Sequence, residues 1–207
     1  MLVHGLWLHG VAMALLGHRI ERCGFNVLTY SYPSLRLNLT ENAQRFARYC
    51  RSIVAPRLNF VGHSLGGLIV LRMLGQAVGL PPGRVVLAGT PSAGCHAARR
   101  FARLPGGRAA LGRSMPEWLE SGRSTGAESH EIGVIAGSLP LGLGRLIAPD
   151  LPRPCDGVVS VIETHVPGMR DQIVLPVSHS GMLVSRPVAR QICAFLRGGA
   201  FVRPVTR

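Results

Sequence analysis

NFVGHSLGGLIV, residues 59–70, is the stretch that decides the fold class. It reads as a short apolar run, then a turn in which two glycines flank a serine, then an apolar helix. Ser64 is the serine of the pattern G-x-S-x-G, which can place a nucleophile on a sharp turn between a strand and a helix. Because that turn strains the backbone and packs closely, side chains at Gly62 and Gly66 are expected to collide with their surroundings.

A second match to this pattern surrounds Ser124, at residues 122–126. Glycine occupies 26 of the 207 positions, so the pattern arises easily by chance and its context must decide. Ser124 follows a short helix predicted over 117–120 and precedes a polar segment. Only Ser64 stands between a predicted strand and a predicted helix, so Ser64 is the candidate nucleophile.

Strand and helix patterns alternate on either side of Ser64. Apolar and β-branched runs predict strands at 1–3, 25–30, 58–61, 84–89, 132–137 and 172–177, and helices at 12–22, 40–54, 65–78 and 186–197. Asn38 and Glu41 resemble a capping box for the helix at 40–54. Strands separated by helices predict an α/β fold, with a mostly parallel sheet of about six strands and helices on both faces.

Residues 91–130 interrupt this alternation, because they are rich in Gly, Arg and Ser and contain no convincing strand. We interpret them as a lid or cap-like insertion within a single domain that spans 1–207. Inside them, the segment 95–104 places Cys95, Ala98, Phe101 and Leu104 at a spacing of three. This spacing fits a cationic amphipathic lid that opens at lipid surfaces. It also fits an ordinary helix packed on the core, which we favour.

The composition is that of a globular protein with an aliphatic core: 47% of residues are hydrophobic and 5% are aromatic. The length favours one domain. The formal net charge is +13, and all 23 basic residues are Arg, spread along the chain rather than gathered in one block. This spread argues against nucleic-acid binding. Attraction to anionic membrane surfaces or to acidic substrates stays open.

The five cysteines are scattered along the chain, at positions 23, 50, 95, 155 and 193. Their odd number and the lack of a C-x-x-C pair predict neither a zinc site nor a disulfide framework. We interpret Cys23, Cys50 and Cys193 as buried thiols, which indicates a reducing compartment. No secretory signal and no apolar run long enough to span a membrane is visible, so we expect a cytoplasmic protein.

A nucleophilic serine needs a histidine as its base, and the base needs an acid to orient it. In a strand–turn–helix arrangement of this kind, the chain order is serine, acid, histidine. His179 directly follows the last predicted strand, where a loop reaches the carboxyl edge of the sheet. His165 lies in the loop before that strand and is the second choice.

Three aspartates and one glutamate are candidates for the acid. Asp156 begins the segment DGVVS after the 132–137 strand and is the first choice. Asp171 abuts the start of the last strand, at the opposite end of the sheet. Asp150 and Glu163 are further alternatives.

The oxyanion formed during acyl transfer needs two backbone N–H donors. We expect one from Leu65, directly after the candidate nucleophile, and one from Leu6, in the loop after the first strand. Val11 is an alternative to Leu6. His63 is expected to pack or to hydrogen-bond, and His4 to order the first loop.

Five segments together resemble the α/β-hydrolase superfamily: VHGLW at 3–7, GHSLGG at 62–67, GTPSAG at 89–94, DGVVSV at 156–161 and SHSG at 178–181. The chain is most similar to a minimal form of this fold, seen in small bacterial lipases and esterases. The resemblance implies a triad of Ser64, Asp156 and His179. It implies hydrolysis of a small-molecule or lipid ester through an acyl-enzyme, with no metal or organic cofactor.

Two alternatives to hydrolysis remain on the same fold. One is acyl transfer to an alcohol, and the other is a catalytically silent binding protein.

The first strand departs from the family pattern, because three residues are fewer than the usual five. An upstream start codon and a genuinely shortened strand both explain it.

Overall fold

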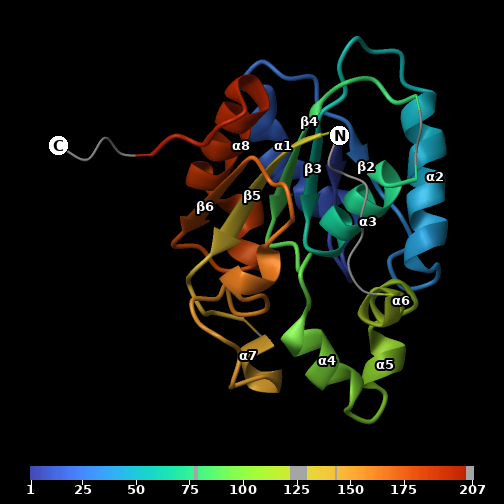
Figure 1. The fold of residues 1–207 in the computed structure, drawn as a ribbon, viewed down its shortest axis with the longest axis vertical. Coiled ribbons are helices and arrows are strands. Elements are labelled where there is room, and N and C mark those ends of the chain that lie inside the picture. Colours follow the sequence, from blue (N-terminus) through green and yellow to red (C-terminus); the bar gives the residue numbers. More distant parts are fainter. Residues whose placement is uncertain (77–78, 122–129, 143, 204–207) are drawn as a thin grey trace.

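The sheet has six strands and is parallel throughout (Figure 1). The computed structural model describes residues 1–76, 79–121, 130–142 and 144–203. The strands are β1 (Leu2–Val3), β2 (Thr29–Tyr30), β3 (Phe60–His63), β4 (Arg84–Ala88), β5 (Glu131–Gly137) and β6 (Asp171–Leu175). Their spatial order is β2-β1-β3-β4-β5-β6. The predicted α/β fold with a mostly parallel sheet of about six strands is therefore confirmed.

Helices cover both faces of the sheet, as continuous apolar strands require. On one face lie α2 (Leu39–Arg51) and α3 (Leu65–Leu74), and on the other α1 (Ala14–Glu21) and α8 (Arg186–Gly198) (Figure 1). The remaining helical elements are α4 (His96–Ala102), α5 (Gly107–Ala110), α6 (Ser114–Ser121), α7 (Gly144–Ile147), η1 (Gly10–Met13), η2 (Val161–Thr164) and η3 (Ser180–Val184). None of the described helices has the length and apolarity needed to span a bilayer.

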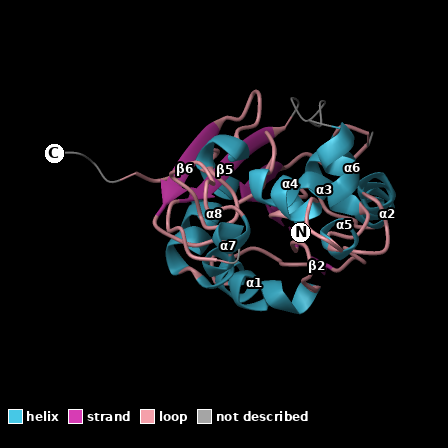
Figure 2. Cartoon of the chain, turned by 90° about the horizontal axis from the view of Figure 1, so that it is seen from below, coloured by secondary structure: helices cyan, strands magenta, loops and turns pink. Residues whose placement is uncertain are grey.

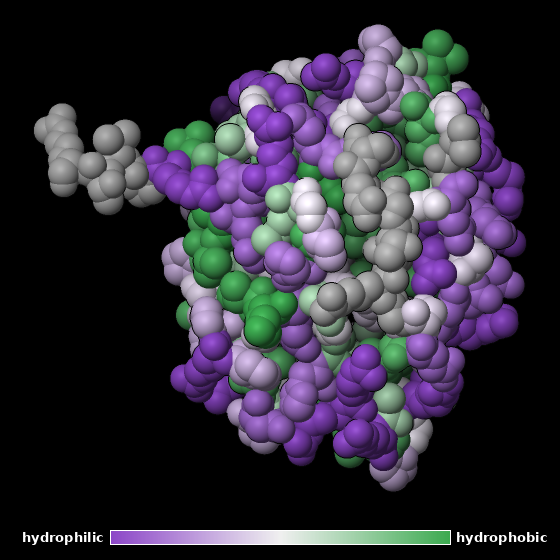
Figure 3. Space-filling model, viewed as in Figure 1, coloured by the Kyte–Doolittle hydropathy of each residue, from purple (hydrophilic) through white to green (hydrophobic). Residues whose placement is uncertain are grey.

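The predicted capping box begins α2. The Asn38 side chain accepts a hydrogen bond from the Glu41 backbone N–H at 2.8 Å, and the Glu41 carboxylate accepts one from the Asn38 N–H at 2.9 Å. Phe46 and its apolar neighbours on α2 are buried against the sheet. The opposite face of α2 is polar, and Figure 3 shows hydrophilic residues along the right-hand edge where this helix lies.

Several predicted boundaries are wrong: the helices predicted at 40–54 and 65–78 end at Arg51 and Leu74, and two strands also differ. The strand predicted at 25–30 is reduced to Thr29–Tyr30 at the edge of the sheet, where β1 offers only two residues for pairing. The strand predicted at 58–61 lies at Phe60–His63 instead, because its pairing with β4 continues through His63 and Ala88. This shift carries the strand up to Ser64.

The prediction of buried thiols is wrong for two cysteines, since Cys23 and Cys193 form a disulfide. Their Cα atoms are 6.4 Å apart although 170 positions separate them in the sequence. The two residues meet because α1 and α8 pack on the same face of the sheet, and no local pattern reveals that contact. Disulfides are typical of oxidising compartments, so this bond weighs against the predicted reducing compartment.

The segment that breaks the alternation folds into α4, α5 and α6 beyond the carboxyl end of the sheet (Figure 1). No strand occurs in its described residues, 91–121 and 130. Cys95 and Ala98 are buried in the same core as α2 and α3, whereas Arg99 and Arg103 are exposed. Phe101 packs partly buried against that core, but Leu104 is 48% exposed, so the predicted apolar face is confirmed only in part. Its action as a lid stays a prediction. Ser124 lies outside the described residues.

Candidate active site

Ser64 stands on a strained turn between β3 and α3. Its φ is 54° and its ψ is −124°, a conformation that side-chain-bearing residues rarely adopt. A Cβ atom on Gly62 would lie 2.4 Å from the Gly67 Cα, and one on Gly66 would lie 2.2 Å from the Val3 carbonyl oxygen. The predicted collisions at both glycines are confirmed, and they explain why this turn needs glycine on either side of the serine.

We expect Gly66→Ala to destabilise the fold by about 3 kcal/mol, because the new methyl group overlaps backbone oxygens that cannot move aside. Chemical denaturation monitored by circular dichroism measures the change. Gly198→Ala, near the end of α8, is the matched control, since nothing lies within 4 Å of its added Cβ. The control is expected to be neutral or slightly stabilising. Equal stability of the two variants would contradict the packing described for the turn.

Asp156 and His179 form a buried hydrogen-bonded pair. The His179 Nδ1 atom lies 2.7 Å from the Asp156 Oδ2 atom, and the two residues are 8% and 1% exposed. The Oδ1 atom of Asp156 accepts from the Val158 and Val159 N–H groups at 2.9 and 2.7 Å. The His179 N–H donates to the Asp156 carbonyl at 2.9 Å. These bonds fix the carboxylate, which in turn fixes the ring.

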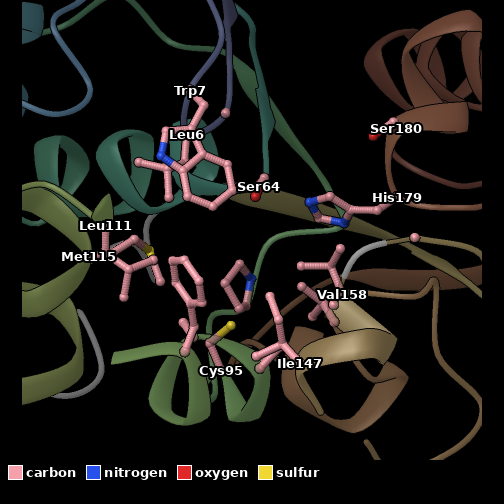
Figure 4. A pocket seen from close by; sticks show the side chains of 18 of the residues that line it. Leu6, Trp7, Ser64, Cys95, Leu111, Met115, Ile147, Val158, His179 and Ser180 are labelled. Atoms are coloured by element: carbon pink, nitrogen blue, oxygen red, sulfur yellow. The ribbon is translucent and has the colours of Figure 1, made fainter. Parts of the chain in front are cut away.

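Ser64 and His179 line one pocket at the carboxyl end of the sheet. In Figure 4 the His179 ring turns one nitrogen toward the Ser64 hydroxyl. Because Nδ1 is engaged by Asp156, Nε2 is the nitrogen left for the pocket. The loops after β3, β5 and β6 therefore bring together all three residues that the sequence pointed to, in the order serine, acid, histidine.

The alternative residues lie elsewhere, and none of them lines this pocket. Asp171 begins β6 at the far end of the sheet and pairs with Arg203. Asp150 is exposed and pairs with Arg100 at 3.0 Å. The others are His165, which is exposed, and Glu163, whose carboxylate caps η2 and whose pKa is raised by burial.

The first loop lies against the serine turn. Leu6 lines the pocket, and a Cβ atom on the preceding Gly5 would lie 3.1 Å from the Ser64 Cβ. Leu65 follows Ser64 as the first residue of α3, where helix N–H groups point toward a developing negative charge. Val11, the alternative donor, is 80% exposed on η1 and does not line the pocket.

His4 is buried and orders this loop, as predicted. Its ring stacks on Tyr32 with the centroids 4.3 Å apart, and its Nδ1 lies 2.9 Å from the Gly5 carbonyl. The Nε2 atom accepts from the Tyr32 backbone N–H at 3.2 Å. Nδ1 therefore carries the proton, and burial lowers the His4 pKa so that the ring stays neutral.

His63 has a structural role that the sequence indicated only in general terms. Its Nε2 atom lies 3.0 Å from the His179 carbonyl oxygen, and its ring centroid is 4.8 Å from that of His179. The Nδ1 atom is buried without a hydrogen-bond partner among the described residues, so the proton resides on Nε2. Burial, with the neighbouring His179, lowers the His63 pKa to about 3. His63 thus holds the His179 backbone without adding charge.

The depressed pKa of His63 makes the fold sensitive to acid. The unfolded chain binds a proton at this residue near pH 6.5, whereas the folded chain does so only near pH 3. Stability attributable to this group is therefore complete above pH 6.5 and falls as the pH drops, by up to about 1.4 kcal/mol per pH unit.

We expect His63→Gln to remove this pH dependence, because the glutamine amide can still donate to the His179 carbonyl but does not titrate. Denaturation curves collected between pH 7 and pH 5 measure the slope of stability against pH. His18→Gln is the control, since His18 is exposed on α1. An unchanged slope in His63→Gln would show that His63 is not held neutral in the folded state.

The pocket has a volume of about 270 Å³ and an apolar wall. Its wall-forming side chains come from the first loop, α4 to α6 and the loops after β5: Leu6, Trp7, Cys95, Ala98, Phe101, Leu111, Met115, Leu141, Ile147, Val158 and Val159. The segment after β5 was not foreseen as a wall, because its apolar residues are scattered among glycines and prolines. Among the described residues, no cluster of His, Cys, Asp and Glu could hold a metal ion.

A family model described as "Alpha/beta hydrolase family" matches residues 1–131. The chain belongs to this family. No curated protein sequence matches the chain. Solved structures of the α/β-hydrolase fold do resemble it, and the most informative are lipases.

Three of these structures show how widely the fold is shared. The mature lipase BlEst2 of Bacillus licheniformis has a TM-score of 0.77 at 16% identity, over 97% of this chain and 91% of that one. The monoacylglycerol lipase of Paleococcus ferrophilus has a TM-score of 0.62 at 15% identity, over 96% and 93%. The phospholipase PlaB of Legionella pneumophila has a TM-score of 0.73 at 16% identity, over 96% and 60%. At these identities the likeness to this α/β hydrolase is one of fold.

Proposed function

We propose that this α/β hydrolase cleaves carboxylic esters through an acyl-enzyme on Ser64. The observation that carries the proposal is the buried Asp156–His179 pair, whose free ring nitrogen shares one apolar pocket with a serine on a strained turn. Each of these features is needed for nucleophilic catalysis by serine and has little structural use on its own. The lipase and esterase neighbours support the same chemistry.

The reaction begins with attack on the ester carbonyl. The Ser64 Oγ atom forms a bond to the carbonyl carbon while His179 Nε2 takes the hydroxyl proton. The carbonyl oxygen becomes an oxyanion, and the N–H groups of Leu6 and Leu65 donate to it. The carbon–oxygen bond to the leaving alcohol then breaks, and His179 returns the proton to that alcohol. Ser64 is left acylated.

Water completes the cycle by the same steps. His179 takes a proton from water as the water oxygen attacks the acyl carbon, and the ester bond to Ser64 Oγ breaks. The proton passes to Ser64, and the carboxylic acid leaves. Throughout, Asp156 keeps the Nδ1–H tautomer of His179 in place and stabilises the imidazolium that forms twice per turnover.

The pocket wall favours an uncharged, apolar ester. Among the residues that the structure describes, no Arg, Asp or Glu side chain lines the pocket, so a charged acyl group would be desolvated without a partner there. The pocket offers burial to apolar carbon instead, and each buried methylene contributes about 0.8 kcal/mol.

A rapid-mixing experiment with p-nitrophenyl esters of increasing acyl length tests this function. We expect a burst of p-nitrophenol stoichiometric with enzyme, followed by slower turnover, because acylation and deacylation are separate steps. Release of free carboxylic acid in the same amount as p-nitrophenol identifies hydrolysis. Formation of a new ester with an added alcohol identifies acyl transfer. Folded protein that releases no p-nitrophenol from any ester in the series would refute the proposal.

A further inference from the structure

Some of the exposed large apolar side chains lie at the pocket or next to it in the chain, although others are spread over the surface. Trp7 and Leu141 line the pocket from opposite loops, yet they are 53% and 62% exposed. Leu146, which precedes the pocket-lining Ile147 on α7, is 81% exposed. Single exposed apolar residues are common on protein surfaces, but a group around one opening indicates contact with an apolar phase or partner.

The loop that contains Leu35 extends this apolar rim. Leu35 is 42% exposed, and its carbonyl accepts from the Arg113 N–H at 3.1 Å in the turn between α5 and α6. Trp7 reaches α5 itself, because its Nε1–H donates to the Ala110 carbonyl at 2.8 Å. Figure 2, which looks at this end of the molecule, shows α4 with α5 to one side of it and α7 to the other. We call Trp7, Leu35, Leu141 and Leu146 the rim.

Arginines accompany the rim. Arg36 follows Leu35, Arg113 follows α5, and Arg145 precedes Leu146. None of the three forms an ion pair with any residue that the structure describes. Nearby Arg108 differs, because Glu120 neutralises it. The rim therefore combines apolar side chains with three unpaired cations.

Trp7 is held in its exposed position by a strained backbone conformation. Its φ is 61°, in the left-handed region that is unfavourable for a large side chain. The bond to Ala110 and an edge contact with Phe101, with ring centroids 6.0 Å apart, fix the indole. A half-buried tryptophan with its N–H satisfied is suited to the boundary between lipid chains and headgroups.

We propose that the rim docks this protein onto lipid surfaces that carry anionic headgroups. The apolar side chains would enter the acyl boundary, and Arg36, Arg113 and Arg145 would pair with phosphates. Nucleic acid fits this surface less well, because the aliphatic rim offers few flat rings for base stacking. Docking in this orientation turns the pocket mouth toward the lipid. The proposal does not depend on Ser64 chemistry.

Binding to vesicles of non-hydrolysable ether lipids tests the docking. We expect the protein to sediment with phosphatidylcholine vesicles that contain about a third of phosphatidylglycerol, and to bind pure phosphatidylcholine at least tenfold more weakly. Salt at about 1 M should release it. Brominated acyl chains should quench Trp7 and spare Trp118, which is 2% exposed. A Trp118→Phe background removes the second signal.

Two triple variants with the same loss of charge separate docking from general attraction. Arg36→Ser/Arg113→Ser/Arg145→Ser should weaken partitioning by about tenfold or more, since each Arg near the surface contributes about fivefold. The control is Arg48→Ser/Arg51→Ser/Arg57→Ser, at the opposite end of the molecule, where α2 ends and the chain returns toward β3 (Figure 1). It should retain most of the binding.

Replacement of the apolar rim residues tests the docking independently of the arginine variants. Leu141→Ser/Leu146→Ser should abolish quenching of Trp7 by brominated chains even where electrostatic attraction persists. Equal losses in the two arginine variants would overturn the proposal, as would binding without quenching in the unaltered protein. Tighter binding to a single-stranded oligonucleotide than to anionic vesicles would overturn it in favour of nucleic acid.

Discussion

Replacement of His179 by alanine is expected to lower kcat for ester hydrolysis about a million-fold, to the level left by binding and oxyanion stabilisation alone. The ring is 8% exposed, its Nδ1 is bonded to Asp156, and its other nitrogen faces the pocket. Without it, neither the attack of Ser64 nor the attack of water has a base. Steady-state kinetics with the best ester of the acyl series measures the loss.

His165→Ala is the control for this experiment. His165 was the second choice from the sequence, and the structure places it on an exposed loop outside the pocket. Its variant should retain activity within about twofold. Comparable losses in both variants, or full activity in His179→Ala, would remove His179 from the role of general base.

Asp156→Asn is expected to lower kcat about ten-thousand-fold while the protein stays folded. The asparagine oxygen can still accept from the Val158 and Val159 N–H groups, which keeps the loop in place. Its amide nitrogen, however, cannot accept from the His179 Nδ1–H, so the ring adopts the wrong tautomer.

Asp150→Asn serves as the matched control, because Asp150 is an exposed acid in the same region of the chain and pairs with Arg100. Its activity should be close to that of the unaltered protein. An Asp156→Asn variant with normal kcat would show that another group orients His179, or that the ring acts alone.

Local patterns predicted most of the fold. The Asn38–Glu41 capping box, the alternation of strands and helices, and the glycines around Ser64 each depend on residues close together in sequence. The prediction from the sequence overestimated the length of the strand at Thr29–Tyr30, because that length is set by the few residues of β1 with which the strand can pair. Pairing partners decide such boundaries more than intrinsic preference does.

Long-range contacts limit what the sequence could reveal. The Cys23–Cys193 disulfide depends on the packing of α1 against α8, and the contact of His63 with His179 joins the ends of two separate strands. The pocket wall formed by Leu141, Ile147 and Val158 likewise has no periodic signal. The order of serine, acid and histidine could be predicted from the sequence, because the loops that follow parallel strands meet at one edge of the sheet.

Covalent labelling by a fluorophosphonate, read by intact mass, tests the central claim most directly. The unaltered protein, Ser64→Ala, Ser124→Ala and Ser180→Ala should be compared, because Ser124 has the second G-x-S-x-G pattern and Ser180 lines the same pocket. We predict one added label in every protein except Ser64→Ala. Labelling of Ser64→Ala, or no labelling of the folded unaltered protein, would contradict Ser64 as an activated nucleophile.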